Sequence, residues 1–253
     1  MRICNLASGS KGNSTYIETK NHKILIDIGM SCVQIEKKLN EIGVDPKDIN
    51  LVLITHAHVD HIKGLSVFNK KYMPQIYVSE KILNEANLEN FQYNRVTDLK
   101  NIADLKIKDI NLSHDVKDIK GFTIEEENSS MVYITDTGYI SEINFEYITN
   151  KNLYIFESNH DIPMLMNNPN YPHHTKIRIL GDKGHLSNKD SAYYLTKIIG
   201  ENTKYIVLAH LSEQNNTEEL ALSSLETALK EKTNYDPKII IAKQDLVGDI
   251  LEI

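Results

Sequence analysis

Short apolar runs alternate with polar turns along the chain and predict β-strands, because a strand buries one face or both and ends at a turn. The run at 51–54 is apolar throughout, which indicates a strand that is buried on both faces. The predicted strands cover residues 2–7, 15–18, 23–28, 51–54, 75–78, 107–112, 121–125, 131–135, 153–157, 205–209, 238–242 and 249–253.

Apolar residues at helical spacing predict helices between several of these strands. The helices cover residues 33–42, a segment that ends at 68, a segment that begins at 79, and residues 188–199 and 217–230. This mixture predicts an α/β (α+β) architecture in which two sheets pack face to face with helices outside them. No repeat and no Pro/Gly-rich linker divides the sequence, so we predict one domain over residues 1–253.

The segment directly after the 51–54 strand is rich in metal-ligand side chains and reads THAHVDH from 55 to 61. Side chains two positions apart in an extended segment point the same way, so His56 and His58 are placed to bind one ion. Asp60 and His61 come where the chain turns into the next helix and are placed to bind a second ion. Imidazole and carboxylate ligands suit zinc, manganese or iron, and a catalytic site keeps a position open for water.

Three further ligand-type residues, His114, Asp136 and His210, each follow a short apolar strand. Each one alone is better explained as an ordinary loop or turn residue. Residues at the ends of strands gather at one rim of a sheet, however, and two metal ions need more ligands than the 55–61 segment supplies. We therefore predict that all three bind metal together with the 55–61 segment.

The remaining polar candidates surround this predicted centre. His185 lies in a loop before a predicted helix and is interpreted as a ligand, an acid/base group or a plain loop residue. Glu157 and His160 follow another buried strand and are predicted to orient the working groups. The adjacent His173 and His174 lie in a proline-led loop and are predicted to be either solvent-exposed or on the substrate side of the site, and not to be ligands.

Composition narrows the setting of this chemistry. The chain is 41% apolar and has no apolar run long enough to cross a bilayer. Its first residues lack the pattern of a signal peptide, and it has only two cysteines, so we expect a cytoplasmic protein without disulfides. The net charge of −7 gives no general attraction to nucleic acid, so any polyanion must be bound locally.

The motifs taken together resemble the metallo-β-lactamase superfamily, and the order and spacing resemble its RNase Z-related phosphodiesterase branch. Within that branch the chain looks most like the WalJ family of bacterial cytoplasmic proteins, which is also called YycJ or VicX. The resemblance covers nearly the whole chain. It rests on residues 6–13, 56–61, 114, 135–138, 157–161, 184–188 and 209–212.

This resemblance implies an αββα four-layer sandwich with a site for two divalent metal ions at one sheet edge. It implies that His56, His58 and His114 hold one metal and that Asp136 bridges both. It implies that Asp60, His61 and His210 hold the second metal. His185 matches the histidine that helps to protonate the leaving group in RNase Z-like enzymes, with an acidic neighbour in the place of Glu157.

The resemblance also implies an activity. WalJ-type proteins are associated with 5′-to-3′ exonuclease activity on double-stranded DNA, with the WalRK two-component system and with mismatch repair. Two features of related enzymes are missing here. The long arm with which RNase Z grips tRNA has no obvious room, and only 74 positions separate Asp136 from His210, too few for an inserted β-CASP domain.

Our hypothesis from the sequence is phosphodiester hydrolysis, with DNA favoured over RNA as the substrate. Asp60 orients the attacking water and accepts its proton, and His185 stabilises charge on the leaving oxygen. Phosphate contacts are assigned to Lys11, Lys176, Arg178 and Lys183. Two alternatives stay open: a thioester, ester or lactone hydrolase of the same fold, and a non-catalytic regulatory partner of a two-component system. The sequence identifies neither the metal nor the oligomeric state.

Overall fold

A computed structural model describes residues 1–88, 91–95, 98–99, 102 and 105–253. The predicted strands and helices recur in it with boundaries that differ by a few residues. The chain divides into two compact units. The first comprises Met1–Lys108, Val116–Lys120 and Lys243–Ile253, and the second comprises Asp109–Asp115 and Gly121–Ala242. The single domain expected over residues 1–253 stays a prediction.

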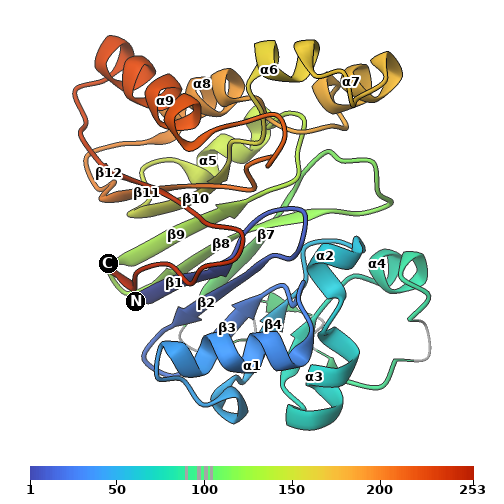
Figure 1. Cartoon of the computed structure of the whole chain (residues 1–253). Helices are drawn as coiled ribbons and strands as arrows, with labels where there is room; N and C mark the ends of the chain where they lie inside the picture. Colours follow the sequence, from blue (N-terminus) through green and yellow to red (C-terminus); the bar gives the residue numbers. More distant parts are fainter. Residues whose placement is uncertain (89–90, 96–97, 100–101, 103–104) are drawn as a thin grey trace. The chain divides into compact units, whose positions relative to one another are not determined.

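The first unit is built on a seven-stranded sheet of order β13-β1-β2-β3-β4-β5-β6. Strands β13, β1, β2 and β3 pair antiparallel, whereas β3, β4, β5 and β6 run parallel. The two chain ends meet at β13, where the Met1 ammonium donates to the Ile253 carbonyl over 3.0 Å (Figure 1). The strands are β1 Arg2–Ala7, β2 Ser14–Glu18, β3 Lys23–Ile26, β4 Leu51–Leu53, β5 Gln75–Tyr77, β6 Asn94–Arg95 and β13 Leu251–Glu252.

Helices of the first unit bury their apolar residues against this sheet. Ile35 and Leu39 of α1 share one core cluster with Phe68 of α3 and with Val52 of β4. Helix α1 begins with a capping box at Ser31, which satisfies amide groups that the first turn leaves without partners. These helices are α1 Cys32–Glu41, α2 Val59–Ile62, α3 Leu65–Tyr72 and α4 Glu80–Glu85, with a 3-10 turn at Pro46–Asp48.

The helix predicted to end at 68 is two helices, α2 and α3, with Gly64 between them. A side chain at Gly64 is sterically excluded, because a Cβ atom there would lie 2.3 Å from the Met30 carbonyl oxygen. The Gly64 amide donates to the carbonyl of Ile28 over 2.9 Å. The chain therefore bends where its backbone packs against the loop after β3.

The second unit is built on a six-stranded sheet of order β12-β11-β10-β9-β8-β7. Strands β9 to β12 run parallel, and β8 pairs antiparallel with β9. The central strand β10 is buried over its whole length, as the sequence pattern predicts. The strands are β7 Lys106–Asn111, β8 Lys120–Glu126, β9 Ser129–Ile134, β10 Leu153–Glu157, β11 Tyr205–Ala209 and β12 Lys238–Ile241.

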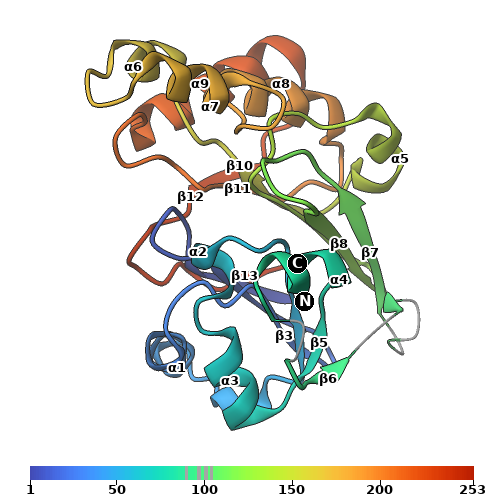
Figure 2. The same cartoon turned by 90° about the vertical axis from the view of Figure 1, so that its right-hand side faces the viewer.

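Helices α8 and α9 lie side by side on one face of this sheet (Figure 1 and Figure 2). Leu195 of α8 and Leu225 of α9 share a core cluster with Phe156 of β10 and Leu208 of β11. The helices of this unit are α5 Phe145–Ile148, α6 Ile162–Asn167, α7 His173–Leu180, α8 Asn188–Ile198 and α9 Glu218–Lys232, with a 3-10 turn at Glu142–Asn144.

The prediction that His173 and His174 lie in a loop is wrong. Both residues form the first turn of α7, and Pro172 is its N-cap. Proline near the start of a helix is favourable, because its fixed φ suits the helix and its missing N–H would lack a partner there. None of the side chains of α7 is buried, so this helix adds nothing to the core.

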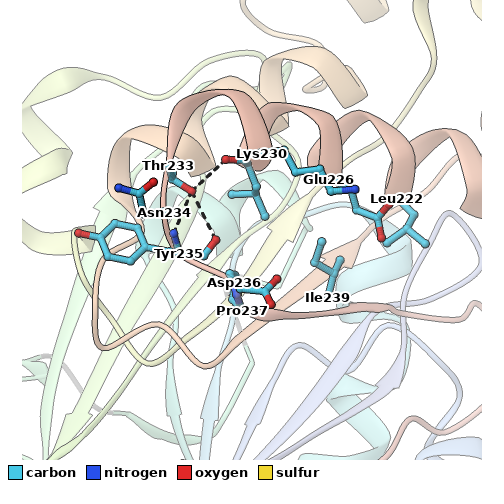
Figure 3. A pocket seen from close by; sticks show the side chains of 10 residues that line it. Leu222, Glu226, Lys230, Thr233, Asn234, Tyr235, Asp236, Pro237 and Ile239 are labelled. Atoms are coloured by element: carbon cyan, nitrogen blue, oxygen red, sulfur yellow. Dashed lines mark hydrogen bonds between the residues drawn. The ribbon is translucent and has the colours of Figure 1, made fainter.

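In the part of the chain that the structure describes, no helix is long and apolar enough to cross a membrane. A pocket of about 470 Å³ lies where α9 ends and β12 begins (Figure 3). Beside it, the Thr233 hydroxyl donates to the Leu229 carbonyl over 3.1 Å. The pocket is lined by Leu222, Glu226, Leu229, Lys230, Thr233, Asn234, Tyr235, Asp236, Pro237 and Ile239, none of which is a predicted site residue.

Candidate metal-binding clusters

The first unit brings the four ligand candidates of the 55–61 segment into one cluster. His56 follows β4, His58 is the N-cap of α2, and Asp60 and His61 lie in its first turns. The ring centroids of His56 and His58 lie 4.8 Å apart, and those of His56 and His61 lie 4.0 Å apart. His56 and His61 are buried, whereas the Asp60 carboxylate is 24% exposed. His56 and His61 are thus shielded from solvent, which reaches the cluster at Asp60.

Asp27, directly after β3, holds the histidines of this cluster in place through hydrogen bonds. Its Oδ2 atom accepts from His61 Nδ1 over 2.7 Å and from the Thr55 hydroxyl over 2.8 Å. Because that hydroxyl gives its proton to Asp27, it accepts from His56 Nδ1, 3.0 Å away. A carboxylate that holds Nδ1 in this way fixes the tautomer and presents Nε2 as the ligand atom.

Complete burial raises the pKa of Asp27, while the neighbouring His61 and the hydrogen bonds from Thr55 act in the opposite direction. Asp27 is 0% exposed and so is His61. An ionised carboxylate is stable in such a place only with these donors around it. The sequence analysis missed Asp27 because the strand was predicted to run over 23–28, whereas it ends at Ile26 and leaves Asp27 in the turn after it.

The second unit gathers its candidates from the ends of separate strands. His114 follows β7, Asp136 follows β9, Glu157 ends β10 and His210 follows β11, and His185 precedes α8. Ligand atoms of four of them lie within 4.8 Å of one another: Asp136, Glu157, His185 and His210. The His185 ring centroid lies 4.8 Å from that of His114 and 5.3 Å from that of His210. The second unit thus forms a cluster of its own.

Glu157 is the hub of this second cluster. Its Oε1 atom accepts from His185 Nδ1 over 2.8 Å and from His210 Nδ1 over 2.9 Å. Its Oε2 atom accepts from the amides of Thr137 and Leu186 over 2.9 and 3.1 Å. Burial raises the pKa of Glu157, but the charge and hydrogen bonds of His185 and His210 outweigh it and lower the pKa to about 2. This fully engaged carboxylate therefore orients two imidazoles.

His114 is held by the loop that carries His185. Its Nδ1 atom donates to the Gly184 carbonyl oxygen over 3.1 Å. Its Nε2 atom lies 3.2 Å from a carboxylate oxygen of Asp115, which in turn pairs with Arg178 over 3.2 Å. Burial lowers the pKa of His114, which favours the neutral imidazole that a metal ion requires. Asp115 was not predicted, because nothing in the sequence sets it apart from other surface acids.

Three site residues have a left-handed backbone, which is uncommon in residues other than glycine. The φ angles are 61° at Asp27, 60° at Asp136 and 57° at His210. This conformation costs roughly 1–2 kcal/mol per residue, and such strain collects at functional sites. Asp27 and His210 directly follow a strand, and Asp136 comes two residues after one. The turn therefore directs each side chain away from the course of the strand.

Of the other predicted site residues, Arg178 is joined to one of these clusters, through its pair with Asp115. His160 is 1% exposed, and among the described residues neither of its ring nitrogens has a hydrogen-bond partner. Burial lowers its pKa to about 4. Lys176 and Arg178 lie on α7, where Lys176 Nζ donates to the Met166 carbonyl over 2.7 Å. Exposed loops carry Lys11 and Lys183. Their predicted roles stay predictions.

Comparison with known proteins agrees with this geometry. A model of the metallo-beta-lactamase superfamily matches residues 7–155. Zn²⁺-bound PqqB from Methylobacterium extorquens has a similar structure, with a TM-score of 0.74 at 14% identity over 100% of both chains. YhfI from Bacillus subtilis has a TM-score of 0.70 at 14% identity over 99% of both chains. The chain belongs to the metallo-beta-lactamase superfamily, whose members bind divalent metal ions.

Curated relatives narrow the class further. The chain is 38% identical over 234 residues to exodeoxyribonuclease YycJ of Bacillus anthracis, which covers 90% of this chain and 88% of the relative. It is 36% identical over 262 residues to exodeoxyribonuclease WalJ of Streptococcus pneumoniae, which covers 98% and 96%. The resemblance drawn from the motifs, the metallo-β-lactamase fold and the class of metal-dependent phosphodiester hydrolase are thereby confirmed.

Proposed function

We propose that this protein is a 5′-to-3′ exonuclease that uses two divalent metal ions to hydrolyse phosphodiester bonds of double-stranded DNA. The observation that carries the proposal is the bond from His185 Nδ1 to the buried Glu157 carboxylate. It equips the second cluster with a proton donor that metal binding alone does not require. The names of the curated relatives support DNA as the substrate.

The metal ligands in this proposal are the seven residues predicted from the sequence. His56, His58 and His114 would hold one ion. Asp60, His61 and His210 would hold the other, and Asp136 would contribute to both. The donor set supports this: His61, His114 and His210 are each anchored through Nδ1, which presents Nε2 for a metal. Imidazole with carboxylate suits zinc, manganese and iron alike. Bound ions would polarise the phosphoryl group and lower the pKa of water.

The side chains divide the proton transfers between them. Asp60, the partly exposed carboxylate of the first cluster, orients the attacking water and accepts its proton. His185 gives a proton to the leaving oxygen from its second ring nitrogen. The ionised Glu157 stabilises the imidazolium that makes this donation, as the aspartate does for the histidine of a serine protease.

Phosphate contacts are assigned to Lys11, Lys176, Arg178 and Lys183. Residues 162–181, which contain α6 and α7, carry no acidic side chain in a chain with 35 acidic residues. The segment itself therefore adds no negative charge to a chain of net charge −7, although the Asp115 carboxylate pairs with its Arg178. Both buried cysteines are free thiols, which supports the reducing cytoplasm as the place of action.

The proposal is tested by a panel of 5′-labelled and 3′-labelled duplex DNA, single-stranded DNA and RNA, together with metal analysis of the purified protein. We expect two divalent ions per chain and early release of the 5′ label from the duplex. His58→Ala should abolish cleavage, whereas His22→Ala, a hairpin-turn histidine of the same unit, should cleave normally. Undiminished cleavage by His58→Ala contradicts the proposal.

The same assay separates the alternatives. Hydrolysis of a thioester with no turnover of bis(p-nitrophenyl) phosphate would identify an ester, thioester or lactone hydrolase. Stoichiometric metal with no turnover of any ester or phosphodiester would identify a regulatory partner. Preferential release of the 3′ label would correct the direction of digestion, and faster cleavage of RNA would correct the substrate.

A further inference from the structure

The glycine-rich loop 8–13 ends at Asn13, whose side chain is 1% exposed. The amide group forms two hydrogen bonds with the backbone of Gly9. Asn13 Oδ1 accepts from the Gly9 amide over 2.8 Å, and Asn13 Nδ2 donates to the Gly9 carbonyl over 3.0 Å. These two bonds fix which end of the amide is nitrogen, because the flipped group would face oxygen with oxygen and nitrogen with nitrogen.

The fixed nitrogen faces two predicted metal ligands. Asn13 Nδ2 lies 3.2 Å from Asp60 Oδ2 and 3.0 Å from His61 Nε2. The His61 nitrogen that faces Asn13 is the one that Asp27 does not hold, so it acts as an acceptor. One Nδ2 hydrogen serves the Gly9 carbonyl, so the remaining N–H of Asn13 is shared between a carboxylate and an imidazole that come from the same turn of α2.

The backbone holds Asn13 at this place as firmly as its side chain does. The Asn13 amide donates to the Asp60 carbonyl over 2.8 Å, and its carbonyl accepts from Gly29 over 2.9 Å. A Cβ atom at Gly29 would lie 1.7 Å from the Asp60 carbonyl oxygen, so the two segments touch backbone to backbone. Gly9 and Gly12 have φ angles of 141° and 155°, which L side chains rarely adopt.

We infer that Asn13 is a positioning residue of the metal centre, one that holds the Asp60 carboxylate ready for the ion shared with His61. This inference rests on the proposed function. When His61 Nε2 binds a metal its lone pair is occupied, and the Asn13 N–H donates to Asp60 Oδ2 alone. The loop then keeps the carboxylate in one orientation, which reduces the freedom that metal binding would otherwise have to remove.

The test measures metal affinity. Metal-free protein is titrated with Zn²⁺ in competition with a chromophoric chelator, and the visible absorption of the Co²⁺ form is recorded. We expect Asn13→Ala to bind the weaker ion about 10- to 100-fold less tightly and to change the Co²⁺ bands. The matched control is Asn5→Ala. Asn5 is also buried in the first unit, but its Nδ2 atom donates to the Thr15 hydroxyl over 3.1 Å.

A second variant guards against failure to fold. Asn13→Ser keeps a polar atom near Gly9 but lacks the reach to Asp60, and we expect the same loss of affinity from it. Wild-type affinity and bands in both Asn13 variants, or an equal loss in Asn5→Ala, would overturn the inference. Wild-type protein that binds no divalent metal would instead overturn the proposed function, so the two failures are distinguishable.

Discussion

The two clusters reach similar chemistry by different routes. In the first unit the ligand candidates come from six consecutive positions, 56–61, and adjacent side chains share one turn of backbone. In the second unit they come from the ends of four strands and the start of α8, spread over 97 residues from 114 to 210. A local motif can be recognised without a fold, whereas a dispersed one exists only once the parallel strands have aligned.

The anchoring carboxylates differ in the same way. Asp27 holds His61 directly and His56 through Thr55, so it serves two neighbours in sequence. Glu157 joins His185 with His210, which lie far apart in the chain. Burial raises the pKa of Asp27, while two imidazoles lower that of Glu157 to about 2. We infer that the first anchor serves ligand geometry and that the second also supports proton transfer.

The largest expected effect is a loss of turnover when Glu157, the anchoring carboxylate of the second cluster, is substituted. Glu157→Gln removes the charge that stabilises protonated His185, so we expect kcat for duplex cleavage to fall by about 10²- to 10⁴-fold. Bound metal should fall much less. The measurement is single-turnover cleavage together with metal analysis. The control is Glu125→Gln on β8, which loses only a surface pair with Lys151. Equal turnover in both variants would remove the proton-transfer role from the second cluster.

The next effect is expected at the first anchor and concerns affinity. Asp27→Asn releases His61 Nδ1 from its carboxylate, so we expect metal binding to weaken by roughly 10- to 100-fold. A Zn²⁺ competition titration measures the affinity. Asp48→Asn is the control, because Asp48 pairs with Lys23 at the surface. Unchanged affinity would show that Asp27 stabilises the fold without orienting ligands, and the contrast between the anchors would fail.

A smaller effect concerns stability against pH in the second unit. The pKa of His160 is lowered to about 4 by burial, while an unfolded histidine titrates near 6.5. Between these values the unfolded chain binds more protons, so stability falls as pH falls. The loss from pH 7 to pH 5 should be about 2 kcal/mol larger in wild type than in His160→Gln. Urea unfolding at both pH values measures it, and His22→Gln serves as the control. Parallel pH profiles for wild type and His160→Gln would disprove it.

The smallest effect is expected on α7. Lys176→Ala and Arg178→Ala should each raise KM for duplex DNA modestly and reduce the slope of log affinity against log salt by about 1, because each removes one phosphate contact. Lys230→Ala, on α9, should leave the slope unchanged. If the slope of the α7 variants equals that of wild type, the nucleic acid is gripped elsewhere and α7 has no part in binding.

The sequence predicted what local pattern encodes. Strands β1, β10 and β11 have the predicted limits, because each is a short apolar run between polar turns. Helix α7 escaped prediction because the proline at its start was interpreted as part of a loop, whereas Pro172 is its N-cap. The superfamily motif identified ligand candidates in both units, but their meeting across the units stays a prediction.

The supporting residues were harder to predict, because their partners lie far along the chain. Asn13 contacts Asp60 across 47 positions and Glu157 contacts His210 across 53. Hydrogen bonds of this kind follow from the fold and leave no spacing in the sequence. Asp27 was missed for another reason, because the predicted strand 23–28 extends past the observed end of β3 at Ile26.

The left-handed backbone of Asp136 and His210 sets stability against function. Glycine adopts that conformation without steric cost, so glycine at either position should relax the turn and also remove a buried polar group. A library selected for heat resistance alone would therefore drift toward glycine at these positions. A library selected for cleavage would keep the strained residues, and sequencing both populations would locate the chemistry without an assay of any single variant.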